Sequence, residues 1–110
     1  MAMFEFLKKK DRTPPALPEG TVRRRYTIWG QVQGVGFRYR AKYAAEQLGL
    51  VGWAENMEDG TVQLEVQGDP ALFPKMFQMI QRSDYIQIAG MRQTDIPPDP
   101  WARGFGVRGY

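Results

Sequence analysis

The chain has 110 residues, 43% of them hydrophobic, and includes three Trp, five Tyr and six Phe, enough for one small domain with a core. It contains neither cysteine nor histidine, which excludes disulfides, thiolate or histidine nucleophiles, and zinc sites of the usual kind. Any catalysis must rely on arginine, carboxylates, amides, hydroxyls, backbone groups or a borrowed metal.

The net charge of +3 is unevenly placed, because residues 1–25 hold seven basic side chains and three acidic ones. A nucleic-acid-binding domain usually spreads its basic residues over a folded face. Here the excess lies in a tail and in the first expected strand, so we expect a solvated basic tail and no nucleic-acid partner. Arg23, Arg24 and Arg25 are expected to be solvated strand charges.

Residues 1–20 are expected to form a flexible tail ahead of a domain at 21–110, because they end in the Pro-rich stretch RTPPALPEG. In the first ten residues the charges follow the apolar run, the reverse of a secretory signal. No apolar run approaches the roughly 20 residues that span a bilayer. We therefore expect a cytoplasmic protein without a membrane partner. A weak amphipathic membrane contact through the apolar side chains near the start is the alternative.

The first expected elements are a strand and a helix. Residues from Arg23 to Val32 alternate between polar and apolar side chains, which predicts a strand. After the glycine-rich VQGVG, the apolar residues switch to helical spacing, and Gly49 is a typical helix end. The apolar residues of this helix are Phe37, Ala41, Ala44, Ala45 and Leu48.

A hairpin follows, with strands at about 51–57 and 61–67 joined at Asp59-Gly60, a dipeptide that supplies the positive φ angles of a tight turn. Asp69-Pro70 then resembles a helix cap followed by proline at the first helical position. The wide apolar face of this second helix is expected to pack in the core. It consists of Leu72, Phe73, Met76, Phe77, Met79 and Ile80.

The last part of the chain predicts two more strands around a proline-rich loop. Tyr85, Ile86 and Ile88 indicate a fourth strand, IPPDPW a loop, and Phe105 and Val107 a short final strand. The order is β-α-β-β-α-β plus a terminal strand. This predicts an α+β fold of the ferredoxin-like, split β-α-β kind, with an antiparallel sheet and two helices on one face.

The stretch GQVQGVGFRYR, residues 30–40, could bind an anion. A glycine-rich passage from strand to helix lets successive backbone N–H groups point into one concavity, and the helix start adds further donors. Arg38 would add a guanidinium that can hold two phosphate oxygens. The alternative is that Gly34 and Gly36 only permit the turn while Arg38 is a solvated helix residue.

Longer motifs resemble acylphosphatases. They are G-Q-V-Q-G-V-G-F-R at 30–38, A-x-x-L-G-L-x-G-W-x-x-N-x-x-D-G-x-V at 45–62 and F-x-V-R-x-Y at 105–110. The resemblance runs from about Arg24 to Tyr110. It implies hydrolysis of acyl phosphates to a carboxylate and inorganic phosphate, without a metal, another cofactor or a covalent phosphoenzyme.

The resemblance also implies roles for single residues. The phosphate-binding loop would be Gln33, Gly34, Val35, Gly36 and Phe37 together with Arg38. Asn56 would position the attacking water, so Arg38 and Asn56 are the expected catalytic residues. Without the resemblance, Asn56 reads more simply as a strand-end residue beside the hairpin turn.

Two positions depart from the family pattern, namely Glu55, where relatives often have a basic residue, and Ser83-Asp84, where Gly-Pro is common. A carboxylate beside the site would disfavour a phosphate unless its side chain points away. The alternative function is a non-catalytic domain that binds phosphate or nucleic acid. A monomer is expected, and the sequence does not identify the acyl group.

Overall fold

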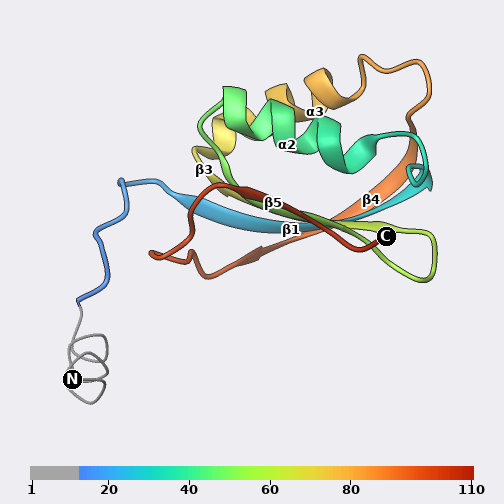
Figure 1. The fold of residues 1–110 in the computed structure, drawn as a ribbon. Coiled ribbons are helices and arrows are strands. Elements are labelled where there is room, and N and C mark those ends of the chain that lie inside the picture. Colours follow the sequence, from blue (N-terminus) through green and yellow to red (C-terminus); the bar gives the residue numbers. More distant parts are fainter. Residues whose placement is uncertain (1–12) are drawn as a thin grey trace, which may run out of the picture.

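The computed structural model describes residues 13–110, so the expectations for residues 1–12 lie outside the described residues. Two helices cover one face of a single five-stranded sheet (Figure 1). In chain order the elements are β1 (Val22–Gln31), α2 (Phe37–Gln47), β2 (Val51–Asn56), β3 (Val62–Gly68), a 3-10 turn η1 (Pro70–Leu72), α3 (Phe73–Ile80), β4 (Gln87–Ile96) and β5 (Phe105–Arg108).

The sheet order is β4-β1-β3-β2-β5. The first four strands pair antiparallel, which agrees with the expected ferredoxin-like arrangement. The short β5 is added at the edge and runs parallel to β2, with Gly52 opposite Phe105 and Glu55 opposite Arg108. The complete sheet is therefore mixed.

Alternation along the strands separates a core face from an open face. On β1, Tyr26 and Ile28 are buried toward the helices, where the Tyr26 ring meets Phe77 edge to face at 4.9 Å. The open face carries Arg23, which is only 7% exposed and pairs with Glu65. The expectation of a solvated Arg23 is wrong, because a buried carboxylate on the neighbouring strand β3 offers it a partner.

The hairpin between β2 and β3 forms where it was predicted, but with a different turn. Of the two turn residues, Asp59 and Gly60, only Gly60 has a positive φ, +91°. Within residues 13–110, positive φ angles occur at glycines alone. The Gly60 N–H donates to the Met57 carbonyl at 3.1 Å, and the Asp59 carboxylate accepts from the Thr61 N–H and hydroxyl. A local side-chain bond thus holds Asp59 in an ordinary conformation.

The second helical segment begins as the sequence predicts. The Asp69 carboxylate accepts from the Ala71 N–H at 3.0 Å, and Pro70 opens the 3-10 turn that leads into α3. The fourth strand begins at Gln87 and extends to Ile96, much further than its apolar residues indicated. β4 is an edge strand of the sheet and pairs with β1. Most of its later side chains are polar and exposed.

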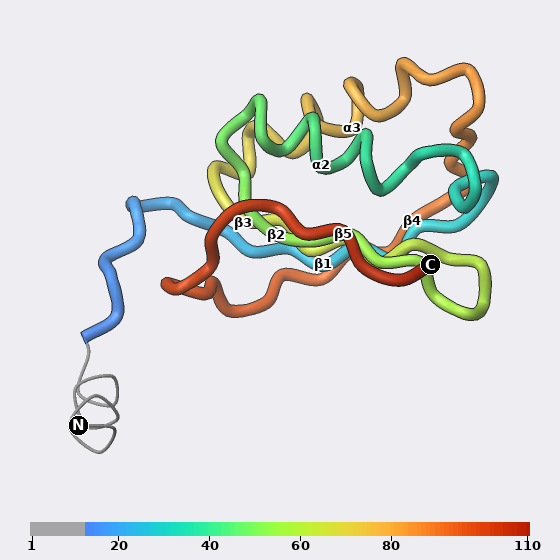
Figure 2. Tube along the Cα trace, in the orientation of Figure 1, coloured from blue at the N-terminus to red at the C-terminus, as the bar shows by residue number. Residues whose placement is uncertain are grey.

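Figure 2 shows that the β1–α2 connection and the end of β5 lie at the same end of the sheet. The connection from β4 to β5 lies at the opposite end, on the side of the sheet away from the helices (Figure 1). This placement decides which side chains meet around Arg38.

Candidate active site

The loop between β1 and α2 adopts a backbone conformation that suits an anion. Gly34 and Gly36 have φ angles of +73° and +82°, and Gly36 caps the start of α2. Among the described residues, the N–H groups of Gly34, Val35 and Gly36 donate no hydrogen bond. Left-handed turns of this kind leave backbone N–H groups available to an anion.

The loop forms one wall of a small cavity of about 150 Å³. The cavity is lined by Val32, Gly34, Gly36, Phe37, Arg38, Tyr39 and Asn56. It therefore brings together both expected catalytic residues and three of the five loop residues predicted to bind phosphate. The remaining two, Gln33 and Val35, do not line it.

Gln33 instead ties the loop to the hairpin. Its Nε2 donates to the Met57 carbonyl at 2.7 Å and to the Thr61 carbonyl at 2.9 Å. Val35 packs against the hydrophobic core as a partly buried residue. The side chains of these two residues thus hold the loop in place, and only their backbone is left for a phosphate.

Arg38 lies in the first turn of α2, and the end of the chain holds its guanidinium. Nη1 donates to the carbonyls of Arg108 at 2.6 Å and Gly109 at 3.0 Å. Nε and Nη2 have no hydrogen-bond partner among residues 13–110. These two donors form one edge of the guanidinium and fit two oxygens of a phosphate.

Asn56 ends β2 and is 9% exposed. Its Nδ2 donates to the Tyr110 carbonyl at 2.7 Å, while its Oδ1 is buried and has no partner in the described part of the chain. Buried acceptors without a partner are uncommon, because each costs about 1–3 kcal/mol. An unpaired oxygen beside a cavity is therefore suited to receive a hydrogen bond from a bound water or substrate.

The sequence reasoning missed the segment Arg108–Tyr110, whose carbonyls hold both Arg38 and Asn56. The closing motif at 105–110 was part of the family resemblance, but nothing in its pattern indicates that it acts through the backbone. Gly109 lies so close to Asn56 that an added Cβ would stand 2.9 Å from the Asn56 carbonyl oxygen. Only glycine fits this contact.

Glu55 does not line the small cavity. It belongs to a neighbouring hollow of about 670 Å³ beside the β2–β3 hairpin, which also contains Glu58, Asp59 and Arg92. The Asp59 pKa is lowered there, first by the Thr61 hydroxyl and then by the Thr61 N–H, with a smaller contribution from Arg92. Asn56 lines both hollows, so they adjoin.

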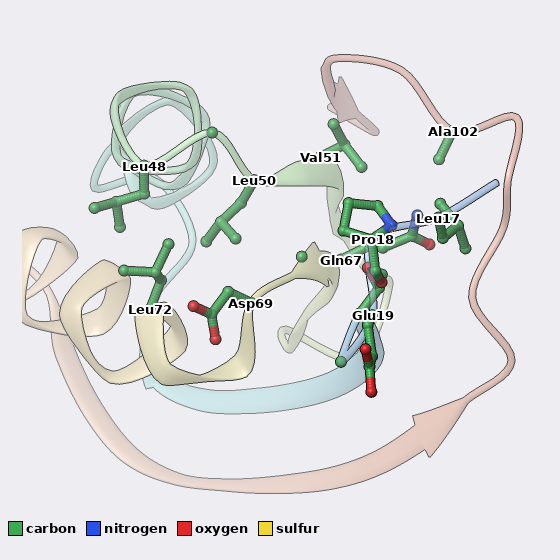
Figure 3. A pocket seen from close by; sticks show the side chains of 14 residues that line it. Leu17, Pro18, Glu19, Leu48, Leu50, Val51, Gln67, Asp69, Leu72 and Ala102 are labelled. Atoms are coloured by element: carbon green, nitrogen blue, oxygen red, sulfur yellow. The ribbon is translucent and has the colours of Figure 1, made fainter. Parts of the chain in front are cut away.

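Another hollow, of about 570 Å³, lies away from these residues (Figure 3). Leu48, Leu50 and Leu72 form one side of it, and Leu17 and Pro18 approach from the N-terminal segment. It contains none of the expected site residues.

In residues 13–110 no three carboxylates are grouped as a metal site would require, and no helix is long and apolar enough to span a membrane.

The family model for acylphosphatase matches residues 24–107. An acylphosphatase of Clostridium perfringens is 35% identical over 87 residues, covering 78% of this chain and 98% of the relative. One from Nocardioides is 40% identical over 84 residues, covering 74% of this chain and 83% of the relative. The crystal structure of acylphosphatase from Bacillus subtilis superposes with a TM-score of 0.70 at 25% identity, covering 78% and 97% of the two chains. The chain belongs to the acylphosphatase family, whose members are hydrolases of acyl phosphates.

Proposed function

We propose that the small cavity is the active site, in which Arg38 and the loop amides hold the phosphate of an acyl phosphate while Asn56 positions the attacking water. One observation carries the assignment. A guanidinium edge, three amides and a buried oxygen, all without partners in residues 13–110, belong to the same cavity or the loop beside it. No metal or other cofactor takes part in the proposed reaction.

Arg38 contributes a positive charge and N–H donors in fixed positions. Because Nη1 is held by two carbonyls, the guanidinium has little freedom left, and its Nε and Nη2 are positioned before the substrate arrives. Phosphoryl transfer passes through a loose transition state whose negative charge spreads over the equatorial oxygens. Donors fixed in advance stabilise that charge without reorganisation, which is the largest contribution in many enzymes.

Asn56 positions the attacking water. An amide is neutral and cannot act as a useful base near pH 7, but its oxygen accepts a hydrogen bond. The bond from Nδ2 to Tyr110 fixes the amide plane and leaves Oδ1 as the acceptor. A water that donates to Oδ1 would keep a lone pair directed at phosphorus, opposite the leaving oxygen.

The reaction needs no acid for the leaving group. The oxygen of the water forms a bond to phosphorus as the bond from phosphorus to the acyl oxygen breaks, and the carboxylate leaves with that electron pair. Both protons of the water end on phosphate oxygens, so an acyl phosphate dianion and water give a carboxylate and a dihydrogen phosphate ion. The substrate phosphate is thus the proton acceptor.

The open sheet face does not favour a nucleic-acid binder. Trp29 on β1 and Trp53 on β2 are separated by β3, whereas stacking platforms place aromatic side chains on adjacent central strands. An arginine guanidinium also lies over each indole ring. That of Arg92 is 5.9 Å from the centroid of the Trp29 ring, and that of Arg108 is 4.4 Å from the centroid of the Trp53 ring. Arg38, the loop amides and Asn56 of a single chain supply every group that the proposed reaction uses, so the proposal requires no second copy.

The test is hydrolysis of a simple acyl phosphate in the presence of a chelator. Replacing Arg38 by Ala should lower kcat/KM by about 10²–10³, and Asn56→Ala should lower kcat by a similar factor, as for other fixed donors. Arg40→Ala and Gln47→Ala, at exposed positions of the same helix, are the matched controls and should keep wild-type rates. Full activity of the Arg38 or Asn56 variant would contradict the assignment.

A further inference from the structure

The structure contains a second basic cavity, on the face of the sheet away from the helices. It has a volume of about 300 Å³ and lies between β2 and the loop that connects β4 to β5. Its charged and aromatic lining consists of Arg23, Arg103, Arg108, Trp53 and Asp99. We propose that this cavity, called here the open-face cavity, binds a small phosphate-bearing anion at a site separate from Arg38.

Arg23 forms the buried part of the open-face cavity. Its Nε donates to Glu65 Oε1 at 2.8 Å and its Nη1 to Gln67 Oε1 at 3.2 Å, which leaves Nη2 without a partner among the described residues. Glu65 also accepts from Arg25, through Oε2. One carboxylate therefore serves two guanidinium groups, and this part of the sheet keeps an excess positive charge.

Arg103 and Arg108 bring two further positive charges that form no ion pair within residues 13–110. The guanidinium of Arg108 stacks on Trp53, 4.4 Å from the ring centroid, and its N–H groups make no hydrogen bond within residues 13–110. Arg103 makes neither a hydrogen bond nor an ion pair with the described residues. Stacking leaves the edge of a guanidinium free to hold a phosphate.

Asp99 is the only acid among the described residues of the lining, and it is turned to its own loop. Its Oδ1 accepts from the Trp101 N–H at 2.9 Å. The same loop is fixed to the sheet by Gln67, whose Nε2 donates to the Asp99 carbonyl at 2.9 Å and whose Oε1 accepts from the Asp99 N–H at 2.8 Å. With the Glu65 carboxylate and Arg25 counted beside Arg23, four arginines and two carboxylates leave two net positive charges at a fixed cavity, which suits a dianion.

The open-face cavity and the active-site cavity lie on opposite faces of the sheet. Ala54 and Asn56 point to the buried face of β2, whereas Trp53, which precedes Ala54, points the other way. Arg108 contributes to both sites through different atoms, since its carbonyl holds Arg38 and its side chain lies on Trp53. A substitution that abolishes phosphate binding at the active site therefore need not affect binding at the open-face cavity.

The experiment is an NMR titration of Arg38→Ala protein with inorganic pyrophosphate at constant ionic strength. This background separates the proposal from the active-site assignment. We expect saturable shifts of the Trp53 indole N–H and of the Gly52 and Gly104 amides at millimolar concentration. Adding Arg103→Ala should weaken the affinity about tenfold, as expected for the loss of one or two charge-assisted hydrogen bonds. Arg82→Ala, also an exposed arginine, is the charge-matched control and should change nothing.

Three results would overturn the proposal. The first is the absence of shifts at Trp53, Gly52 and Gly104. The second is an equal effect of Arg103→Ala and Arg82→Ala, which would mean that only net charge matters. The third is an identical response to chloride, which would indicate screening instead of a site. Because Arg103 is exposed on a loop, its replacement should not prevent folding.

Discussion

Arg38 and Asn56 donate hydrogen bonds to three consecutive carbonyls at the end of the chain, Arg38 to those of Arg108 and Gly109 and Asn56 to that of Tyr110. The phosphate-binding cation and the water-positioning amide proposed here are thus fixed by one short segment. A displacement of this segment should disturb both groups together.

Gly109→Ala is predicted to lower kcat by about 10–10² while the protein stays folded. The new Cβ would stand 2.9 Å from the Asn56 carbonyl oxygen, and the φ of +80° is strained for alanine by about 1–2 kcal/mol. The segment must shift, and both side chains lose their anchors. Steady-state kinetics measures the effect.

Gly106→Ala is the matched control for this prediction. It lies on β5, just before the terminal segment, has no positive φ, and its added Cβ would meet only the Trp53 Cβ at an ordinary 3.7 Å. Equal rates for the two variants would show that the terminal segment does not position the catalytic groups.

The sequence predicted the layers of the fold because its periodic patterns are local. The polar and apolar alternation of β1 and the helical spacing of α2 each depend on burial of one face, so both could be read without the structure. The parallel addition of β5 could not, because four residues carry too little pattern to specify a partner strand.

The same contrast applies to the site. The glycines and Arg38 are contiguous in sequence, so their combination indicates anion binding by itself. The anchoring of Arg38 by carbonyls 70 and 71 residues away depends on no side-chain identity and leaves no signal in sequence. The motif predicts that Gln33 binds phosphate, although its side chain turns to the hairpin.

Replacing Gln33 by Met should weaken phosphate binding by about three- to tenfold. The substitution keeps the length of the side chain and removes the two hydrogen bonds that hold the loop to the hairpin, each worth about 0.5–1.5 kcal/mol. The Met57 and Thr61 carbonyls keep other donors, so no acceptor is left unpaired. The inhibition constant of inorganic phosphate reports the change, with exposed Gln31→Met as control. An unchanged constant would mean that the loop keeps its shape unaided.

Replacing Glu55 by Gln should change kcat/KM by less than about threefold. The Glu55 side chain lies on the opposite face of β2 from Asn56 and lines the neighbouring hollow only. Solvent and salt screen a carboxylate in that position. Rates at low and high ionic strength test this, with Glu46→Gln on the exposed face of α2 as the charge-matched control. A tenfold rise specific to Glu55 would show that its charge opposes the substrate.

Glu65→Gln is predicted to lower the free energy of unfolding by about 3 kcal/mol, because it leaves the buried Arg23 without its charged partner. For a domain of this size the melting temperature should fall by about 10 °C or more. Glu46→Gln, which breaks no ion pair among the described residues, should melt like the wild type. Equal melting temperatures for both variants would show that the buried pair adds no stability.

The same carboxylate should make stability depend on pH. Burial raises the Glu65 pKa, but the hydrogen bonds from Arg25 and Arg23 outweigh it, so the pKa is lowered in the folded state. The stabilisation is therefore complete above the unfolded-state pKa of about 4.3 and is lost as pH falls through the lower folded-state value. Urea titrations between pH 3 and pH 7, in steps of about one unit, should show a shallower acid dependence for Glu65→Gln. Some dependence should remain, because hydrogen bonds from Arg24 and Thr61 also lower the pKa values of Asp95 and Asp59. An unchanged slope would place the acid sensitivity entirely in those two exposed carboxylates.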